Sequence, residues 1–407
     1  MRSRSWKVLT VSLATGIGLV AGGAIGLLAQ GQPGGRSRSS PVSQPSSPSP
    51  TPRPAVRPVV PDTILAWTPG GLPPSLAAGV RKLPAVDHVV DVVSGIVWLT
   101  GSYDGTGNQV DRPPAGLGIP LEVAGADLAQ YAHFLSPADR SALPLLARGE
   151  VALGASSAAL RRLGPGGTLV FGHRQVRIGA VLPDASIGAN EVFASRATAA
   201  RLGVAIPRYL LIDPARNASR RKLTAGIRSL LPPGVLLQIR GPGETPFFRQ
   251  GDAVLPTIRM KELFGEFAAR PEANGFFEMD PNWVTRHIVT ASVPLLGSVR
   301  CNRALFPQLQ GALTEVVSQG LSQLLRPGDY GGCYSPRFIN ANPRAGISHH
   351  AWGAAIDINV STNQYGHTPH QDPRLVAIFE RWGFTWGGRW LLPDGMHFEF
   401  IRFPSGG

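Results

Sequence analysis

Two short blocks near the C-terminus place the strongest limit on how this chain can fold. The first, Ser348–Asp357, reads SHHAWGAAID, and the second, Asp394–Glu399, reads DGMHFE. Between them they supply His350, Asp357 and His397, which are two imidazoles and one carboxylate. Because a catalytic zinc ion takes three protein ligands of these types and keeps a fourth position open, the pattern predicts that both blocks meet at one metal ion.

The residues beside these side chains predict short strands. Residues 355–360 read AIDINV, an alternating, β-branched run that favours a strand carrying Asp357. In a second strand, His397 and Glu399 would share one face while Phe398 points into the core. Two rigid strands would therefore present most of the proposed ligands.

Metal-dependent hydrolysis also needs a base that accepts the proton of the attacking water. Asp394, three residues before His397, and Glu399, two residues after it, are both candidates. A glutamate on the same strand face as a histidine is well placed to orient its imidazole. We therefore expect Asp394 to be the base and Glu399 to orient His397, with Glu399 as the alternative base.

The two blocks together resemble the M15 family of zinc peptidases. The resemblance rests on Ser-x-His-x-x-Gly-x-Ala-x-Asp followed by Asp-x-Met-His-Phe-Glu, and it extends over Lys261–Phe403. This family includes D-Ala-D-Ala carboxypeptidases and dipeptidases, and L-alanyl-D-glutamate endopeptidases that cut peptidoglycan stem peptides. The resemblance implies one zinc ion per chain, held by His350, Asp357 and His397.

The resemblance also implies further site residues. The acid three positions before the last histidine is the catalytic base of the family, and here it is Asp394, as in the endopeptidase-like branch; several other branches carry Glu. An arginine upstream of the first block, matched by Arg337, often stabilises the substrate or its oxyanion. Ser348 is a candidate for orienting the substrate. Trp386 is a candidate for lining the cleft, with packing in the core as an equal alternative.

Two further patterns concern the framework of this region. Cys301 and Cys333 are the only cysteines, and without CxxC spacing in a translocated region they predict one disulfide. Between them, apolar residues recur at helical spacing over Leu305–Leu325, which predicts a long helix packed against the catalytic sheet. Asp372–Arg381 opens with Asp-Pro, which predicts a second, capped helix.

The N-terminal residues indicate that the chain enters the cell envelope. Residues 1–7 hold three basic side chains and no acid, and residues 8–30 hold no charge. An apolar stretch of this length behind a basic tail predicts a transmembrane anchor with a cytoplasmic N-terminus, with a cleaved signal peptide as the alternative. Residues 31–62 are rich in Pro, Ser and Gly, which predicts an extended linker.

The net charge of +13 is compatible with nucleic acid, anionic lipid or cell-wall polymer as a partner. No nucleic-acid motif or lysine-rich patch accompanies this charge. We therefore expect a bacterial envelope protein, membrane-anchored or secreted, that has no nucleic-acid partner.

Residues 63–256 predict a mixed α/β domain without a cluster of His, Cys and acidic residues. Strands are expected at residues 89–100, 151–153, 168–171 and 176–182, and a helix at residues 156–163. Glycine-containing segments resemble the extracytoplasmic core domain of MacB-type and FtsX-type transporter permeases; they are residues 149–154, 163–169 and 176–182. The resemblance implies a role in protein contacts, with another envelope protein as a possible partner.

Together these patterns predict an α+β protein. Residues 257–407 would form a peptidase domain of the Hedgehog/D-Ala-D-Ala peptidase type, with a small antiparallel sheet and packed helices. The expected activity is zinc-dependent hydrolysis of amide bonds in peptidoglycan stem peptides during cell-wall remodelling, as a D-Ala-D-Ala carboxypeptidase or an L-Ala-D-Glu endopeptidase. The alternatives are a catalytically inactive wall-binding or regulatory module, and an endopeptidase that acts on proteins.

Overall fold

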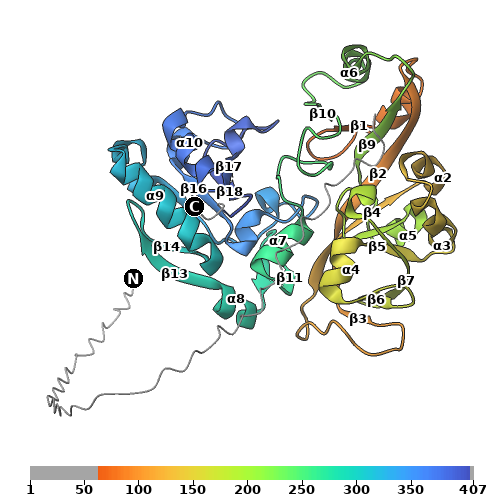
Figure 1. The fold of residues 1–407 in the computed structure, drawn as a ribbon, viewed down its shortest axis with the longest axis horizontal. Helices are drawn as coiled ribbons and strands as arrows, with labels where there is room; N and C mark the ends of the chain where they lie inside the picture. The colour runs from red at the N-terminus through yellow and green to blue at the C-terminus, as the bar shows by residue number, and fades with distance from the viewer. Residues whose placement is uncertain (1–62, 404–407) are drawn as a thin grey trace, which may run out of the picture. The chain divides into compact units, whose positions relative to one another are not determined.

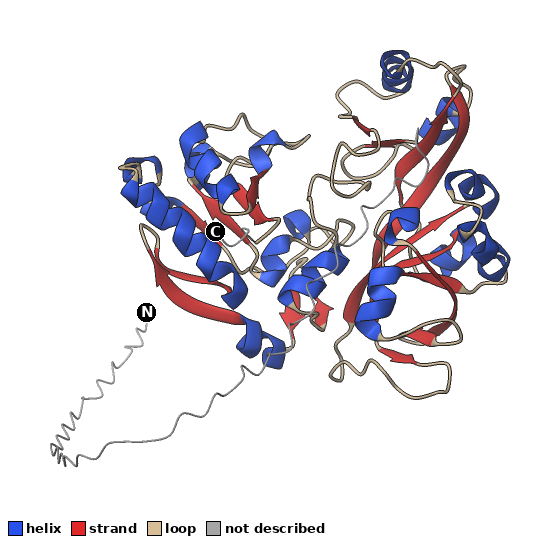
Figure 2. Cartoon of the chain, in the orientation of Figure 1, coloured by secondary structure: helices blue, strands red, loops and turns tan. Residues whose placement is uncertain are grey.

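The computed structural model describes residues 63–403 (Figure 1). These residues form one large sheet, one four-stranded sheet and two two-stranded ribbons, with helices interspersed among them (Figure 2). The predicted α+β class is therefore confirmed. The predicted basic tail, transmembrane helix and linker, residues 1–62, lie outside the described residues. Within residues 63–403, no helix is both long enough and apolar enough to cross a membrane.

The middle region is built on a ten-stranded mixed sheet. Its strands, in spatial order, are β10 (Gln238–Arg240), β1 (Ile64–Trp67), β9 (Pro207–Pro214), β2 (Val86–Leu99), β4 (Ile119–Ala126), β8 (Val192–Ser195), β5 (Val151–Gly154), β7 (Arg174–Leu182), β6 (Thr168–Phe171) and β3 (Gly101–Tyr103). The accompanying helices are α1 (Leu76–Val80), α2 (Leu128–Tyr131), α3 (Leu143–Ala147), α4 (Ala155–Arg161), α5 (Arg196–Arg201) and α6 (Arg220–Ser229). The strand predicted at residues 168–171 is present with the same bounds.

The position of β4 explains its composition. It pairs with β2 in antiparallel fashion on one side and with β8 in parallel on the other. All eight of its residues are buried, which an almost wholly apolar strand tolerates without cost. Its one charged side chain, Glu122, is paired with Arg249.

The C-terminal region carries the small sheet that the sequence predicts. Its strands run in the order β15 (Tyr330–Gly332), β16 (Ala355–Ile358), β18 (His397–Phe400) and β17 (Phe384–Trp386), all antiparallel. The other elements are α7 (Thr257–Phe264), β11 (Ala269–Pro271), β12 (Phe277–Met279), α8 (Pro281–His287), β13 (Ile288–Val293), β14 (Gly297–Asn302), α9 (Phe306–Ser318) and α10 (Pro373–Arg381). Asp372 caps α10 by accepting a hydrogen bond from the Arg374 amide, as its Asp-Pro sequence predicts.

The helix predicted over Leu305–Leu325 is shorter than expected. The regular helix α9 ends at Ser318, because Gly320 turns the chain with a positive φ of 67°. Leu321 and Leu325 still reach the hydrophobic core, but from the turn after the helix. Apart from the turn that directly precedes it, the main partners of α9 are α10 and β13. The helix therefore shares a core with the four-stranded sheet but packs chiefly on other elements.

Strand β16 also ends earlier than the predicted residues 355–360. Asn359 adopts a left-handed conformation with a φ of 53°, which ends the strand after Ile358. Its side-chain amide donates to the Leu324 carbonyl and to Gln371 Oε1, at 2.8 and 2.9 Å. These bonds offset the cost of a left-handed residue that is not glycine.

The structure joins Cys301 and Cys333 in the predicted disulfide, with 5.3 Å between the Cα atoms. The bond fixes the end of β14 to the segment that leads toward Arg337. Both cysteines are buried in the hydrophobic core.

Candidate metal centre

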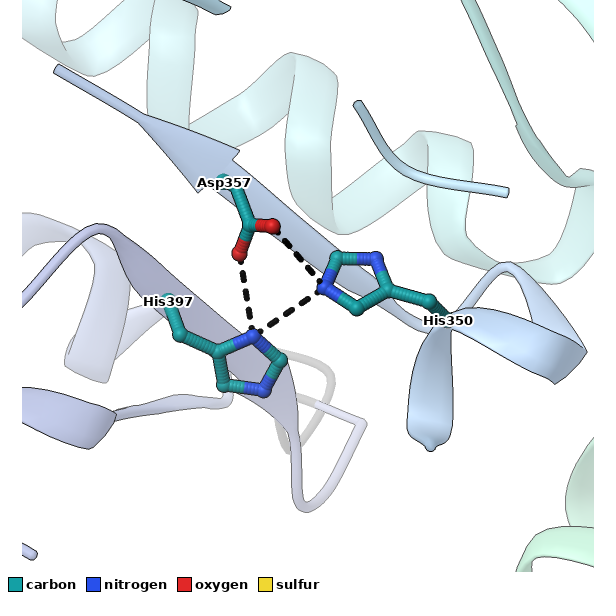
Figure 3. A group of neighbouring side chains, drawn as sticks. All are labelled: His350, Asp357 and His397. Carbon is teal, nitrogen blue, oxygen red and sulfur yellow. Dashed lines mark hydrogen bonds and ion pairs between the residues drawn. The ribbon is translucent and has the colours of Figure 1, made fainter. Parts of the chain in front are cut away.

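The side chains of His350, Asp357 and His397 point toward one another (Figure 3). His350 Nε2 lies 3.2 Å from Asp357 Oδ2, His397 Nδ1 lies 3.0 Å from Asp357 Oδ1, and the two nitrogens lie 3.1 Å apart. All three residues are buried, with exposed fractions of 3%, 9% and 6%. The structure therefore brings the two sequence blocks together, as expected.

The sheet register places two of these residues opposite each other. Asp357 on β16 pairs directly with His397 on β18, so both side chains emerge on the same face. His350 arrives from the short 3-10 turn His349–Trp352, which ends at Gly353. Gly353 has a φ of 64°, and a Cβ there would lie 2.6 Å from the Asn302 amide nitrogen. This turn therefore requires glycine.

Neighbouring groups determine which nitrogen of each imidazole faces the cluster. His350 Nδ1 donates to the Cys333 carbonyl at 2.8 Å, which leaves Nε2 free to face Asp357. His397 Nε2 lies 3.4 Å from Glu399 Oε2, which leaves His397 Nδ1 to face the Asp357 carboxylate. The ring nitrogens that point inward are thus Nε2 of His350 and Nδ1 of His397.

The electrostatics of the cluster favour positive charge. Burial opposes ionisation of Asp357, but His350 and His397 outweigh it and hold its pKa well below the ordinary value. Burial lowers the pKa of His397, but Asp357 and Glu399 outweigh it and raise that pKa to about 10. A buried site that attracts a proton this strongly also suits a divalent cation.

The donor set fits zinc. Two imidazole nitrogens and one carboxylate oxygen lie within 4.8 Å of one another, and they are of the types that catalytic zinc sites use. Glu399, Cys333 and the sheet register already orient these groups before any ion binds.

Asp394 has the features of a base. It is half-buried, and its Oδ1 has no hydrogen-bond partner among the described residues. Burial raises the pKa of this carboxyl, partly offset by His397. Its backbone amide donates to the Gly387 carbonyl at 2.9 Å, which anchors the loop that carries it. A buried carboxylate oxygen without a partner is uncommon in folded proteins, and it is available to accept a proton.

Glu399 is engaged by three groups. Its Oε1 accepts from the Val254 amide at 3.0 Å. Its Oε2 lies 3.4 Å from His397 Nε2 and 2.9 Å from His349 Nδ1. Burial opposes its ionisation, but His349 and His397 outweigh it and hold the pKa of Glu399 well below the ordinary value. This environment suits orientation of His397 better than proton transfer.

The other predicted residues lie in the same neighbourhood. Ser348 Oγ accepts from the His350 amide at 3.3 Å, so it shapes the ligand-bearing turn. Arg337 is half-buried, and its charge acts to lower the pKa of Asp394. Trp386 donates from Nε1 to the Gly395 carbonyl at 2.8 Å and supports the loop beside Asp394.

Sequence reasoning missed two neighbours of the site. The rings of Trp390 and His397 have centroids 5.1 Å apart and are tilted by 51°. Trp390 and Trp386 both lie in residues 382–390, which hold three tryptophans and one phenylalanine, and this aromatic run was the only sequence signal for Trp390. His349, the neighbour of His350 in the sequence, lies buried against Glu399.

The segment that holds both blocks also matches a known family. Residues 341–400 match the family model described as D-alanyl-D-alanine carboxypeptidase. The carboxypeptidase match includes all three converging residues and Asp394, and it confirms the resemblance predicted for this part of the chain. It supports a peptidase.

Two solved structures are similar to other parts of the chain. The periplasmic region of MacB from Actinobacillus actinomycetemcomitans is 15% identical, with a TM-score of 0.30 over 44% of this chain and 88% of its own. The extracellular domain of the noncanonic ABC-type transporter YknZ from Gram-positive bacteria is 12% identical, with a TM-score of 0.28 over 42% of this chain and 92% of its own. MacB is the type of transporter that the middle region resembles in sequence, but at these TM-scores the likeness carries no conclusion about its role.

Proposed function

We propose that the C-terminal region is a zinc-dependent peptidase that hydrolyses amide bonds in peptidoglycan stem peptides. The observation that carries the proposal is the convergence of His350, Asp357 and His397, whose facing ring nitrogens and carboxylate oxygens lie 3.0–3.2 Å apart. All three residues lie inside the segment that matches the carboxypeptidase family. Stem peptides are the substrate class because this family's description names a D-alanyl-D-alanine bond.

These three residues would hold the ion through Nε2 of His350, the Asp357 carboxylate and Nδ1 of His397. When bound, zinc supplies a Lewis acid for the scissile carbonyl and lowers the pKa of water toward neutrality. Asp394 is the base in this proposal, because its Oδ1 has no partner in the described part of the chain and a raised pKa suits a group that accepts and then releases a proton.

Arg337 and the loop residues complete the proposed site. The Arg337 guanidinium is suited to neutralising a developing oxyanion or to holding a substrate carboxylate through paired hydrogen bonds. Ser348 keeps the turn that carries His350 in place and orients the substrate from there. Trp386 contributes by supporting the Gly395 carbonyl next to Asp394.

The cellular setting is also part of the proposal. A peptidase for stem peptides works outside the cytoplasm, which agrees with the disulfide. The N-terminal segment would anchor the protein in the membrane or direct its secretion. The middle region would contact another envelope protein.

Mass spectrometry of defined muropeptides incubated with the purified full-length protein tests this function. We expect a single shortened stem peptide, its loss with a chelator and its recovery with added zinc. The His350→Ala variant should lose bound zinc and at least about a thousandfold in kcat/KM. A parallel incubation with a protein substrate tests the alternative of a general endopeptidase, which would cleave the protein, whereas a peptidase specific for stem peptides would not.

Two results would contradict the proposal. Wild-type turnover that persists in chelator, with no metal in the protein, would exclude a zinc enzyme. Stoichiometric zinc and bound stem peptide without any product would instead identify a wall-binding module.

A further inference from the structure

The segment that joins the middle region to the C-terminal region contacts the candidate site at two points. Asp252 Oδ1 accepts a hydrogen bond from the Leu391 amide at 3.3 Å. Two residues later, the Val254 amide donates to Glu399 Oε1 at 3.0 Å. The partners are 139 and 145 residues apart in the sequence, so folding brings them together and local structure does not.

Both contacts reach groups next to the proposed reacting atoms. Glu399 lies against His397 Nε2, on the side of the ring that faces away from the cluster. Leu391 belongs to the loop that begins at Gly387 and ends at Asp394, closed by the bond between the Asp394 amide and the Gly387 carbonyl. The same loop carries Trp390, whose ring lies beside His397.

The joining segment is itself held on the large sheet of the middle region. The Arg249 guanidinium forms two hydrogen bonds with the Glu122 carboxylate on β4, at 2.7 and 3.1 Å. Arg240 on β10 donates to the carbonyls of Arg249 and Gly251, at 2.9 and 2.6 Å. Paired guanidinium–carboxylate bonds of this kind fix orientation as well as distance.

The side chain of Leu391 gives independent evidence. It packs against the hydrophobic cluster of the middle region that includes Tyr131 and Phe193. The loop that carries Asp394 is thus attached to the middle region by the hydrogen bond from the Leu391 amide to Asp252 and by the apolar contact of the Leu391 side chain.

We propose that Asp252 is a positioning residue for the candidate site, and that residues 249–254 hold the Asp394 loop and Glu399 in place from the middle region. This inference rests on the proposed function. In the proposed enzyme, the middle region contributes to turnover because it supports the loop that carries the base Asp394. Displacement of a reacting group by about 1 Å can cost on the order of a hundredfold in rate.

Three variants of the full-length protein test the role of Asp252. Asp252→Ala removes the acceptor for the Leu391 amide, whereas Asp252→Asn keeps an oxygen acceptor at the same position. Asp91→Ala is the matched control, because Asp91 is a partly buried aspartate that pairs with Arg196 within the middle region. Each variant is measured for zinc content, for kcat and KM on a stem peptide, and for hydrogen exchange of the peptide covering residues 387–396.

We expect Asp252→Ala to keep one zinc and a KM within about twofold of wild type, but to lose about tenfold to a hundredfold in kcat. Exchange in residues 387–396 should be faster in this variant and unchanged in Asp91→Ala. Asp252→Asn should restore kcat to within about threefold, because its carbonyl still accepts the amide.

Wild-type exchange of residues 387–396 in Asp252→Ala would overturn the inference whatever the activity, as would equal losses of kcat in the Ala and Asn variants. If the wild-type protein cleaves no stem peptide while exchange responds as expected, the proposed function fails and the attachment of the loop stands. The two failures are therefore distinguishable.

Discussion

Two groups of buried charged residues in this molecule differ in how completely they are paired. At the junction of the two regions, Lys261 Nζ lies 2.8 Å from Glu191 Oε1 and 3.0 Å from Glu266 Oε1. Arg161 pairs with the same two glutamates. At the candidate metal centre, by contrast, Asp394 Oδ1 is buried and has no hydrogen-bond partner within residues 63–403. All carboxylate oxygens of Glu191 and Glu266 are bonded, and these two glutamates join the two regions. A buried carboxylate oxygen without a bond, beside a candidate metal centre, is instead available to accept a proton.

The pKa values of Glu266 and Asp394 follow this difference. Burial raises the pKa of Glu266, but Lys261 and Arg161 outweigh it and leave the pKa below the ordinary value. Burial also raises the pKa of Asp394, and there His397 offsets it only in part, so the pKa stays raised. Desolvation acts at both carboxyls, and only at Glu266 do the nearby cations outweigh it. At the more deeply buried Glu191, burial prevails over the same two cations and the pKa is raised.

The largest effect is expected from Asp394→Asn. The variant keeps the size of the side chain and all three proposed ligands but cannot accept a proton. We expect unchanged zinc content and a kcat lower by about a hundredfold to ten-thousandfold, measured on a stem peptide. Asp87→Asn, on the exposed part of β2, is the control. Full activity of Asp394→Asn would show that Asp394 is not the base and would favour Glu399 in that role.

Lys261→Met should break the paired group at the junction. The change leaves Glu191 buried without one of its two cations, which we expect to lower the free energy of unfolding by about 3–5 kcal/mol in denaturant titrations. Lys222→Met, exposed on α6, is the control and should change it by less than about 0.5 kcal/mol.

This variant also has an expected pH dependence. Burial raises the pKa of Glu191, with Lys261 acting against that rise. Lys261 stabilises the fold only while Glu191 and Glu266 are ionised, so the difference from wild type should shrink as the pH falls toward the ordinary glutamate value of 4.5. A difference that grows at acid pH would show that Lys261 acts through packing and not through charge.

The smallest effect is expected from Glu399→Gln. Loss of the carboxylate weakens the orientation of His397, and we expect zinc affinity to fall by about tenfold to a hundredfold in a competition titration with a chelating dye. Glu315→Gln, on α9, serves as the control. If Glu399→Gln lowered stability as much as Lys261→Met without changing zinc affinity, Glu399 would belong with the structural group.

Local patterns in the sequence predicted part of the fold accurately. Strand β6 and the Asp372 cap of α10 were predicted correctly, because turn glycines and capping residues act over a few neighbouring positions. The predicted helix to Leu325 and strand to Val360 ran too long. Gly320 and Asn359 turn the chain there, and apolar spacing alone does not show where a left-handed residue will stand.

The sequence by itself determined which side chains the candidate site offers, since His350, Asp357 and His397 stand in two short blocks. Only the tertiary structure decided which nitrogen of each ring faces the carboxylate, and that Trp390 lies beside His397. It alone placed Asp252 and Val254 behind the site. Such contacts join residues far apart in the chain and depend on how whole regions pack, which no short pattern encodes.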